Sequence, residues 1–294
     1  MLSKKTLGTQ NSVLGTQYYI KSMKPMLINA LLIIALCSAG LVVFVYLMQD
    51  RMIYFPFHQI EQTPRDIGLE FEDLTITTPD REKINAWFIP APNARAVLLF
   101  CHGNAGNISH RLDLLRMLNS LSLSVLLFDY RGYGKSSGKP SEQGTYQDAE
   151  AAWDYLRNRR ATPPARIIVF GESIGGAVAV ELALRRQVGG LVLLAGFTSL
   201  PELGQQLYPW LPVKLLAKYR YASLEKIRSI TCPKLIIHSP EDEIVPFHHG
   251  RKLFEQACAP KEFLEIRGGH NEGFLVSGDV FIGGMKIFFD KYGF

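Results

Sequence analysis

Short runs of apolar residues recur along most of the chain, separated by polar segments that contain turn-forming residues. The later runs are continuously apolar, which is typical of strands covered on both faces. Segments with apolar residues at helical spacing lie between them. This alternation predicts an α/β fold with a mostly parallel central sheet and helices on both faces. The predicted strands are 71–78, 85–90, 96–101, 124–129, 166–171, 190–195, 234–239 and 262–266, and the predicted helices are 109–119, 141–160, 173–187, 249–258 and 278–291.

Two segments depart from this alternation. The tight turn TPDREK joins 71–78 to 85–90 and predicts an antiparallel hairpin at one edge of the sheet. Residues 197–227 lie between two predicted strands and contain three prolines and several aromatic residues, where a single helix would suffice. We interpret 197–227 as a short lid made of small helices. A structural insertion without substrate contact is the alternative.

An uncharged apolar segment, MLINALLIIALCSAGLVVFVYLM, occupies residues 26–48. As a helix it reaches about 34 Å, enough to span a bilayer. We interpret it as a transmembrane signal anchor. The alternatives are a cleaved signal peptide, whose apolar region is shorter at about 7–15 residues, and a buried core helix. Residues 1–25 are polar and are predicted to be disordered.

The charges that flank the apolar segment predict its orientation. Four lysines precede it, whereas one arginine and one aspartate follow directly. By the positive-inside rule the N-terminus lies in the cytoplasm, and residues 50–294 lie on the outer, periplasmic or luminal side.

The size and composition of the chain limit the classes of function. Its 294 residues, 47% of them hydrophobic, allow one α/β catalytic domain over 50–294. Four of the 32 basic residues precede residue 50, which leaves 28 basic against 27 acidic residues in that domain. Such a balance argues against nucleic-acid binding. The four cysteines have no C-x-x-C spacing and indicate neither a disulfide framework nor a zinc site.

The stretch VFGESIGGAV, residues 169–178, places Ser173 where a predicted strand meets a predicted helix. Ser173 could be an ordinary helix N-cap, because a serine oxygen accepts hydrogen bonds from the free amides of a helix start. Alternatively, residues 171–175 fit G-x-S-x-G, a sharp turn that exposes a nucleophilic serine. A serine nucleophile needs a base and an acid that orients the base. The remaining sequence therefore decides between the two interpretations.

Candidates for both partners follow Ser173 in the order acid, then histidine. Asp242 in HSPEDEIVP and His270 in GGHNEGF each follow an apolar segment, at the strand ends where open α/β sheets place their sites. We expect Asp242 to be the acid, with the flanking Glu241 and Glu243 as alternatives. We expect His270 to be the base, because it alone combines a late position, a Gly-Gly approach and a following helix.

Acyl transfer also requires backbone N–H donors for the oxyanion. We expect one donor to be the N–H of Ile174 at the helix start, and the other to be that of Asn104 in the loop FCHGNAGN. A dyad of Cys101 and His102 is disfavoured, because adjacent residues on a strand point to opposite faces.

Three further polar motifs are given structural roles. The loop DYRGYGKSSG at 129–138 is expected to shape the rim of the pocket, with Arg131 or Tyr133 pairing buried polar groups. His248 and His249 are expected to begin a helix, and their spacing to other ligands makes no metal site. The sequence predicts neither a metal nor an organic cofactor.

Five ordered motifs, HGNAGN, DYRGYGKSSG, GESIGG, EDEIVP and GGHN, resemble the membrane-anchored abhydrolase-domain branch of the α/β-hydrolase superfamily. The similarity begins at RMIYFP, residues 51–56, and extends almost to the C-terminus. Two features depart from relatives: Glu172 stands where many carry His or Gln, and the lid is short compared with the caps of many lipases. The resemblance implies an α/β-hydrolase fold with nucleophile Ser173, acid Asp242, base His270 and the amides of Asn104 and Ile174 as oxyanion donors.

Members of this branch include thioesterases that remove fatty acyl groups from proteins, as well as esterases. The sequence therefore predicts a membrane-tethered serine hydrolase that cleaves carboxylic esters or thioesters through an acyl-enzyme, with a lipid or an acylated protein as a candidate substrate. A serine peptidase with the same machinery and a catalytically silent scaffold are the alternatives. Dehalogenase chemistry is disfavoured, because it needs a carboxylate at the position of Ser173.

Overall fold

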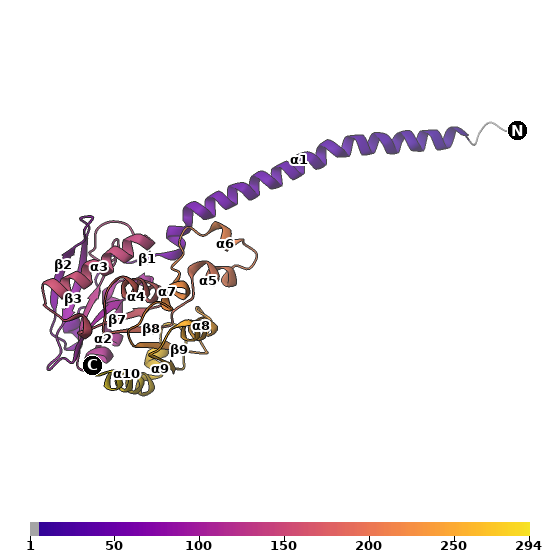
Figure 1. Cartoon of the computed structure of the whole chain (residues 1–294). Coiled ribbons are helices and arrows are strands. Elements are labelled where there is room, and N and C mark those ends of the chain that lie inside the picture. The colour runs from indigo at the N-terminus through magenta and orange to yellow at the C-terminus, as the bar shows by residue number, and fades with distance from the viewer. Residues whose placement is uncertain (1–5) are drawn as a thin grey trace. The chain divides into compact units, whose positions relative to one another are not determined.

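The computed structural model describes residues 6–294, with the side chains from Pro25 onward. The chain forms two compact units, Met1–Gln49 and Asp50–Phe294. Helix α1, Thr6–Ile53, includes all of the described part of the first unit (Figure 1). Its segment Pro25–Ile53 has a mean hydropathy of 2.7 and is long and apolar enough to cross a membrane, although a signal sequence would meet the same criteria.

The helix begins earlier than the sequence suggested. Residues 6–25 are helical, whereas 1–25 was predicted to be disordered; residues 1–5 lie outside the described residues. Residues 6–24 contain no proline. Because each residue added to an existing helix gains a hydrogen bond without a new nucleation step, the apolar helix extends into its polar flank.

The second unit is built on an eight-stranded sheet in the order β10-β9-β8-β7-β4-β6-β3-β2 (Figure 1). The pairs from β10 to β6 are parallel, whereas β3 pairs antiparallel with both β6 and β2. The predicted antiparallel hairpin at the sheet edge is therefore confirmed. The strands are β2 Glu72–Thr77, β3 Lys83–Ile89, β4 Ala96–Cys101, β6 Leu123–Phe128, β7 Ile167–Glu172, β8 Gly190–Leu194, β9 Lys234–His238 and β10 Lys261–Glu265.

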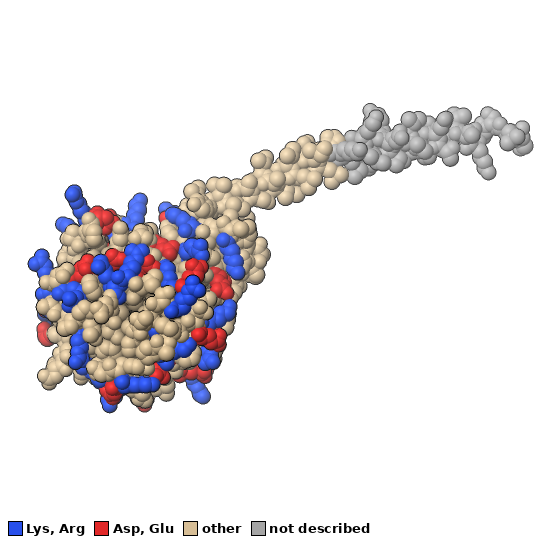
Figure 2. Space-filling view, viewed as in Figure 1, with Lys and Arg blue, Asp and Glu red and all other residues tan. Residues whose placement is uncertain are grey.

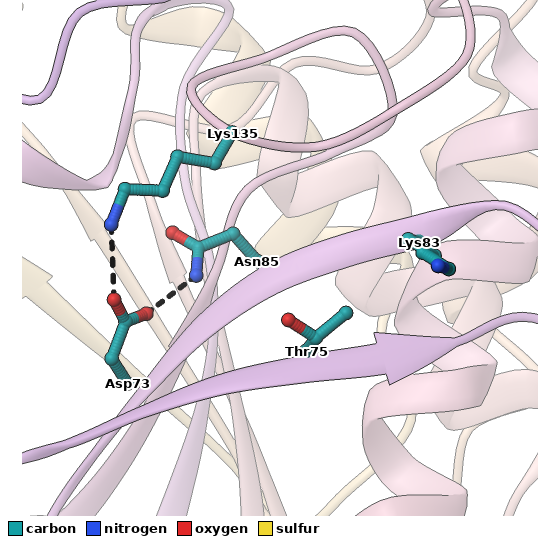
Figure 3. A pocket seen from close by; sticks show the side chains of 5 residues that line it. All are labelled: Asp73, Thr75, Lys83, Asn85 and Lys135. Atoms are coloured by element: carbon teal, nitrogen blue, oxygen red, sulfur yellow. Dashed lines mark hydrogen bonds and ion pairs between the residues drawn. The ribbon is translucent and has the colours of Figure 1, made fainter.

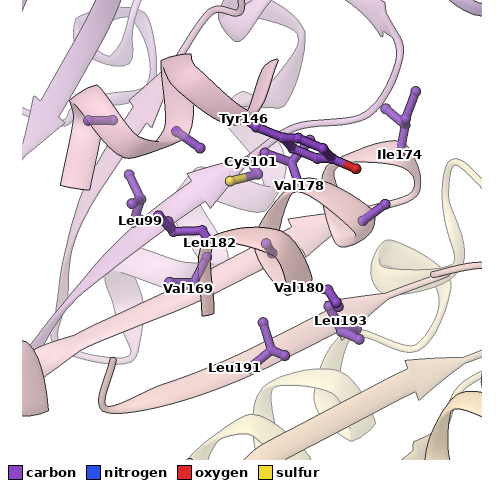
Figure 4. Close-up of a cluster of buried hydrophobic side chains, with 14 of the residues drawn as sticks. Leu99, Cys101, Tyr146, Val169, Ile174, Val178, Val180, Leu182, Leu191 and Leu193 are labelled. Atoms are coloured by element: carbon purple, nitrogen blue, oxygen red, sulfur yellow. The ribbon is translucent and has the colours of Figure 1, made fainter. Parts of the chain in front are cut away.

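Helices cover both faces of this sheet, because successive residues of each buried strand point to opposite sides. Leu99 and Cys101 of β4 belong to one apolar cluster, whereas Leu98 and Phe100 belong to another. The first cluster lies under α3 Glu142–Asn158, α4 Ile174–Arg185 and α8 His248–Gln256 (Figure 4). The second lies under α2 Leu112–Ser120, α9 Gly273–Val276 and α10 Gly278–Tyr292. The continuously apolar strands of the sequence are explained by this two-sided burial.

The segment between β8 and β9 contains three short helices, α5 Leu200–Leu207, α6 Val213–Leu216 and α7 Ser223–Ile227. Short helices were expected within 197–227. Prolines limit their length: Pro201 occupies the first turn of α5, and Pro212 precedes α6.

Several short elements were not predicted from the sequence. Strands β1 Phe55–Pro56 and β5 Ala105–Gly106 form a parallel pair outside the main sheet. Three single turns of 3-10 helix, η1 Pro64–Ile67, η2 Ile108–Arg111 and η3 Pro164–Arg166, lie in connections; of these, η2 begins the predicted helix 109–119. Elements of two to four residues are too short to show a hydrophobic period.

Candidate active site

Ser173 lies at the sharp turn between β7 and α4. Its φ of 54° and ψ of −118° are unusual for a residue with a side chain, and such strain is found at functional sites. Ser173 occupies the N-cap position of α4, but its side chain makes no capping hydrogen bond in the described structure. The N-cap interpretation therefore does not account for this serine.

The glycines of G-x-S-x-G are required because backbone passes directly beside them. A Cβ on Gly171 would overlap the carbonyl of Gly175 and the Cα of Gly176. A Cβ on Gly175 would overlap the carbonyl oxygen of Cys101, the last residue of β4. The motif thus lets α4 start tightly against the ends of two neighbouring strands, which aims the Ser173 side chain away from the sheet.

Ser173, His270 and Asp242 are joined by hydrogen bonds although they are far apart in sequence. His270 Nε2 lies 3.0 Å from Ser173 Oγ, and His270 Nδ1 lies 2.8 Å from Asp242 Oδ2. With the proton on Nδ1 donated to the carboxylate, Nε2 accepts the hydrogen of the serine hydroxyl. The side chains of His270 and Asp242 are 8% and 1% exposed, which keeps bulk water from competing for these bonds.

The backbone after Asp242 fixes its carboxylate. Asp242 Oδ1 accepts the N–H groups of Ile244 and Val245 at 3.0 and 2.7 Å, which leaves Oδ2 for His270. Burial alone would raise the pKa of Asp242, but hydrogen bonds from His238 and His270 and the charge of His270 hold that pKa well below its usual range. Asp242 is therefore ionised at neutral pH.

The two flanking glutamates bind the histidine loop through its backbone. Glu241 Oε2 accepts the N–H of Gly268 at 2.8 Å, and Glu243 Oε2 accepts the N–H of His270 at 3.1 Å. Both carboxylates thus hold the loop that carries His270. Glu241 and Glu243, the alternative candidates for the acid, thus bind backbone N–H groups, whereas Asp242 contacts the imidazole ring.

His238, at the end of β9, is a neighbour of Asp242 that sequence analysis missed. It is fully buried, with Nε2 2.8 Å from the Val245 carbonyl oxygen and 3.4 Å from Asp242 Oδ2. The only signal in the sequence was a histidine four residues before the acid. In an apolar strand, that position gives no indication of which way the ring points.

The amides expected to serve the oxyanion belong to two loops that border Ser173. Among the residues that the structure describes, neither the Ile174 N–H nor the Asn104 N–H donates to a protein acceptor. The Asn104 carbonyl accepts the Phe55 N–H at 3.0 Å and the Tyr133 hydroxyl at 2.7 Å. The Asn104 side chain donates to the Ile53 carbonyl at 2.9 Å. These bonds fix the orientation of the Asn104 backbone.

Glu172 ties these two loops together. Its Oε2 lies 2.9 Å from Arg111 Nε and 3.3 Å from the Gly103 nitrogen, which donates to it. Arg111 Nη2 also donates to the Ala105 carbonyl at 2.8 Å. Both charged side chains are less than 15% exposed. The departure noted at Glu172 in the sequence is thus a link between the serine turn and the loop that carries Asn104.

In the loop 129–138, Arg131 and Tyr133 make the kind of polar pairing predicted for them. Arg131 binds the buried carboxylate of Asp148 at 2.8 Å and that of Asp80 at 2.7 Å, and Tyr133 donates to Asn104. Together these contacts fix the loop against the neighbouring hairpin and against the Asn104 turn.

Cys101 and the remaining histidines take no part in the serine relay. Cys101 is fully buried, which raises the pKa of its thiol, and His102 Nδ1 lies 2.7 Å from the Gly103 carbonyl oxygen. Helix α8 begins at His248, as expected. Among the described residues, no group of three or more His, Cys, Asp or Glu side chains is placed to hold a metal ion.

A separate polar hollow of about 300 Å³ lies at the β2–β3 hairpin and is lined by Asp73, Thr75, Lys83, Asn85 and Lys135 (Figure 3). Asp73 bonds Lys135 Nζ at 3.0 Å and Asn85 Nδ2 at 2.6 Å. No residue of the serine site lines it. Figure 2 shows Lys and Arg mixed with Asp and Glu over the visible face of the domain, in line with its balanced charge.

The fold and the serine turn define a protein of the α/β-hydrolase class, and comparisons with known proteins agree. The alpha/beta hydrolase fold family matches residues 96–226. An uncharacterized protein of Mycobacterium tuberculosis, Rv2307c, is 40% identical over 87% of this chain and 92% of its own length. The alpha/beta hydrolase domain-containing protein WAV2 of Arabidopsis thaliana is 34% identical over 83% of this chain and 88% of its own.

Among solved structures, the Pyrococcus furiosus esterase Pf2001 matches with a TM-score of 0.69 and 21% identity, over 82% of this chain and 98% of the esterase. At this identity the match concerns the fold. The chain therefore belongs to the α/β-hydrolase superfamily.

Proposed function

We propose that the protein is a membrane-tethered serine hydrolase that cleaves carboxylic esters or thioesters through an acyl-enzyme. The observation that carries the proposal is the continuous series of hydrogen bonds from Ser173 Oγ through His270 to Asp242, with distances of 3.0 and 2.8 Å. A serine hydroxyl becomes an effective nucleophile only with such a base and orienting acid.

In the proposed reaction, Ser173 Oγ attacks the carbonyl carbon while His270 Nε2 takes the hydroxyl proton. The negative charge that develops on the carbonyl oxygen is stabilised by the N–H groups of Asn104 and Ile174. His270 then gives its proton to the departing alcohol or thiol, which leaves an ester on Ser173. Water, deprotonated by His270, attacks this ester and releases the acid. Asp242 stays ionised throughout and stabilises the imidazolium.

The tether in this proposal is residues 26–48 within α1, with the N-terminus in the cytoplasm and the catalytic domain, 50–294, on the other side of the membrane. The length and hydropathy of Pro25–Ile53 support it. Alkaline carbonate extraction of membranes tests the anchor, since an anchored chain stays in the pellet. Protease protection in sealed vesicles tests the orientation.

The enzymatic proposal is tested on the full chain in detergent with p-nitrophenyl acyl esters, acyl thioesters and a fluorophosphonate probe. We expect a burst of p-nitrophenol followed by steady turnover, and labelling at Ser173. Ser173→Ala should lower kcat about 10⁴-fold or more. Ser120→Ala, at an exposed serine whose hydroxyl donates to the Met117 carbonyl, is the matched control. A folded wild-type chain with neither turnover nor labelling would refute the proposal, and cleavage of amides alone would replace it with a peptidase.

A further inference from the structure

Four large side chains stand exposed on α5, α6 and the turn between them. Leu207, Tyr208, Trp210 and Leu215 are 47%, 43%, 71% and 86% exposed, and we call these four residues the lid patch. Helices α5 and α6 pack on each other, so the four residues belong to one local structure (Figure 1). A concentration of large exposed apolar side chains marks a contact surface in a folded protein.

The charged residues of the chain segment around the lid patch are basic, and two of them pair with acidic residues outside that segment. Residues 203–224 contain no acidic residue but three basic ones, Lys214, Lys218 and Arg220. Lys218 pairs with Asp50, and Arg220 pairs with Glu225. Lys214 stands directly beside Leu215 in α6. Aromatic and aliphatic side chains combined with positive charge are typical of surfaces that lie in the membrane interface.

The contacts of Asp50 attach the segment that carries the lid patch to the residue that begins the catalytic unit. Asp50 Oδ1 accepts the Lys218 ammonium at 2.9 Å and the Tyr219 hydroxyl at 2.6 Å. Asp50 is the first residue of the catalytic unit, and it follows the predicted span 26–48 by two residues. Lys218 is three positions after Leu215, a chain distance of at most about 11 Å. Wherever the span emerges from the bilayer, the lid segment is therefore attached beside that point.

The segment 197–227 also begins close to Ser173, the proposed nucleophile. Strand β8 ends at Leu194, whose carbonyl oxygen accepts the Ser173 N–H at 2.9 Å, and the segment 197–227 starts three residues later. The chain segment that carries the lid patch therefore leaves the sheet beside the turn that carries Ser173, at the carboxyl end of β8.

We propose that the lid patch inserts into the membrane interface and holds the catalytic unit against the bilayer surface. This inference rests on the proposed function for its membrane tether. Tyr208 and Trp210 lie at headgroup level, Leu207 and Leu215 reach the acyl chains, and Lys214 contacts anionic phosphate groups.

The position of Trp210 is tested on the full chain reconstituted in vesicles of zwitterionic and anionic phospholipid. The difference in tryptophan emission between wild type and Trp210→Phe isolates Trp210 from Trp87 and Trp153. Phospholipids that carry a doxyl quencher near the headgroup should quench this difference signal. A signal that doxyl lipids leave unchanged overturns the inference. So does a signal that shifts with protein concentration in detergent and resists lipid quenchers, because a second copy then covers the patch.

The interfacial contact is also tested with the double variant Trp210→Ser/Leu215→Ser. Its matched control is Val280→Ser/Ile287→Ser on α10, where the two side chains are 54% and 70% exposed. Loss of the interfacial contacts should lower kcat/KM about tenfold for a long-chain ester presented in vesicles. It should leave a short water-soluble ester unaffected, and the control should change neither. Equal activity of both double variants on vesicles overturns the inference. A wild type inactive on both esters refutes the proposed function instead, and the quenching result still decides the lid contact.

Discussion

Glu172 Oε2 accepts the N–H of Gly103 at 3.3 Å, so the residue before the serine holds the loop that carries Asn104. Arg111 stabilises this arrangement from the other side, 2.9 Å from the same carboxylate oxygen. The positive charge of Arg111 therefore balances the negative charge of Glu172 within the site. Relative placement of the serine and one proposed oxyanion donor depends on this carboxylate.

Glu172→Gln should lower kcat and leave KM for a short ester nearly unchanged. The neutral amide keeps the shape of the side chain but weakens its hold on Gly103 and on Arg111. We expect a loss of about tenfold in kcat, since small displacements of catalytic groups have effects of this order or larger. Glu150→Gln, which removes a carboxylate paired with Arg185 on the surface, is the control. Steady-state kinetics that show equal kcat for both variants would contradict the role given to Glu172.

Ser173→Gly should be more stable than Ser173→Ala. Both variants lack the hydroxyl, but alanine keeps a Cβ at a φ of 54° that disfavours one. Relief of this strain stabilises the glycine variant, and the greater flexibility of glycine in the unfolded chain offsets part of the gain. The free energy of unfolding should therefore be about 1 kcal/mol higher for the glycine variant than for the alanine variant. Chemical denaturation in detergent measures the difference. An alanine variant of equal or greater stability would show that the turn is relaxed.

Much of this site could be predicted from the sequence because its determinants are local. Ser173, Asp242 and His270 each stand next to a strand with a clear hydrophobic pattern, and parallel strands bring their carboxyl ends to one edge. The roles of Glu172 and His238 depend instead on side chains that meet across the fold. Contacts of this kind leave no hydrophobic period or fixed spacing in the sequence.

Asp242→Asn should lower kcat by about 10⁴-fold, because an amide favours the wrong tautomer of His270. Glu243→Gln should have a much smaller effect, since Glu243 accepts the His270 backbone N–H and Asp242 binds the ring. Comparison of the two variants by ester hydrolysis assigns the acid. A greater loss in the Glu243 variant would move that role to Glu243.

Asp242 should also contribute to stability in a pH-dependent way. Its folded-state pKa is lowered, so its contribution is present above the unfolded-state pKa of about 3.9 and is lost as the pH falls through the folded-state value. The thermal unfolding midpoint of wild type should therefore drop more steeply below about pH 4 than that of Asp242→Asn. Parallel curves for the two proteins would contradict the lowered pKa.

Titration of His249 should reduce the stability of the segment 197–227 in mild acid. Burial, together with the charge of His248, lowers the pKa of His249 from 6.5 to about 4. Its ring contacts Thr198 Oγ1 at 2.8 Å and Gln206 Oε1 at 3.0 Å, both in the lid segment. The unfolded chain takes up a proton near pH 6.5 and the folded chain only near pH 4, so stability falls as the pH decreases between these values.

The expected loss of stability from His249 is at most about 3 kcal/mol across that interval. His249→Gln should flatten the dependence, and His248→Gln, at a more exposed ring, should flatten it less. Protection factors of the α5 amides, from hydrogen exchange corrected for the intrinsic rate at each pH between 7 and 4.5, follow the loosening. Protection factors that do not change with pH in wild type would contradict the assignment.

Residues just after the proposed span support the proposed oxyanion loop, since the Ile53 carbonyl and the Phe55 N–H both bind Asn104. A protease that cut between Phe57 and the following residues would separate this support from the domain, whereas a cut before Asp50 would keep it. Proteolytic release from the membrane would then have opposite results depending on the cleavage site. Cleavage after Phe57 should inactivate the domain, whereas cleavage before Asp50 should yield an active, freely diffusing form. The length of juxtamembrane chain retained, compared in matched truncations, should set the turnover of short esters.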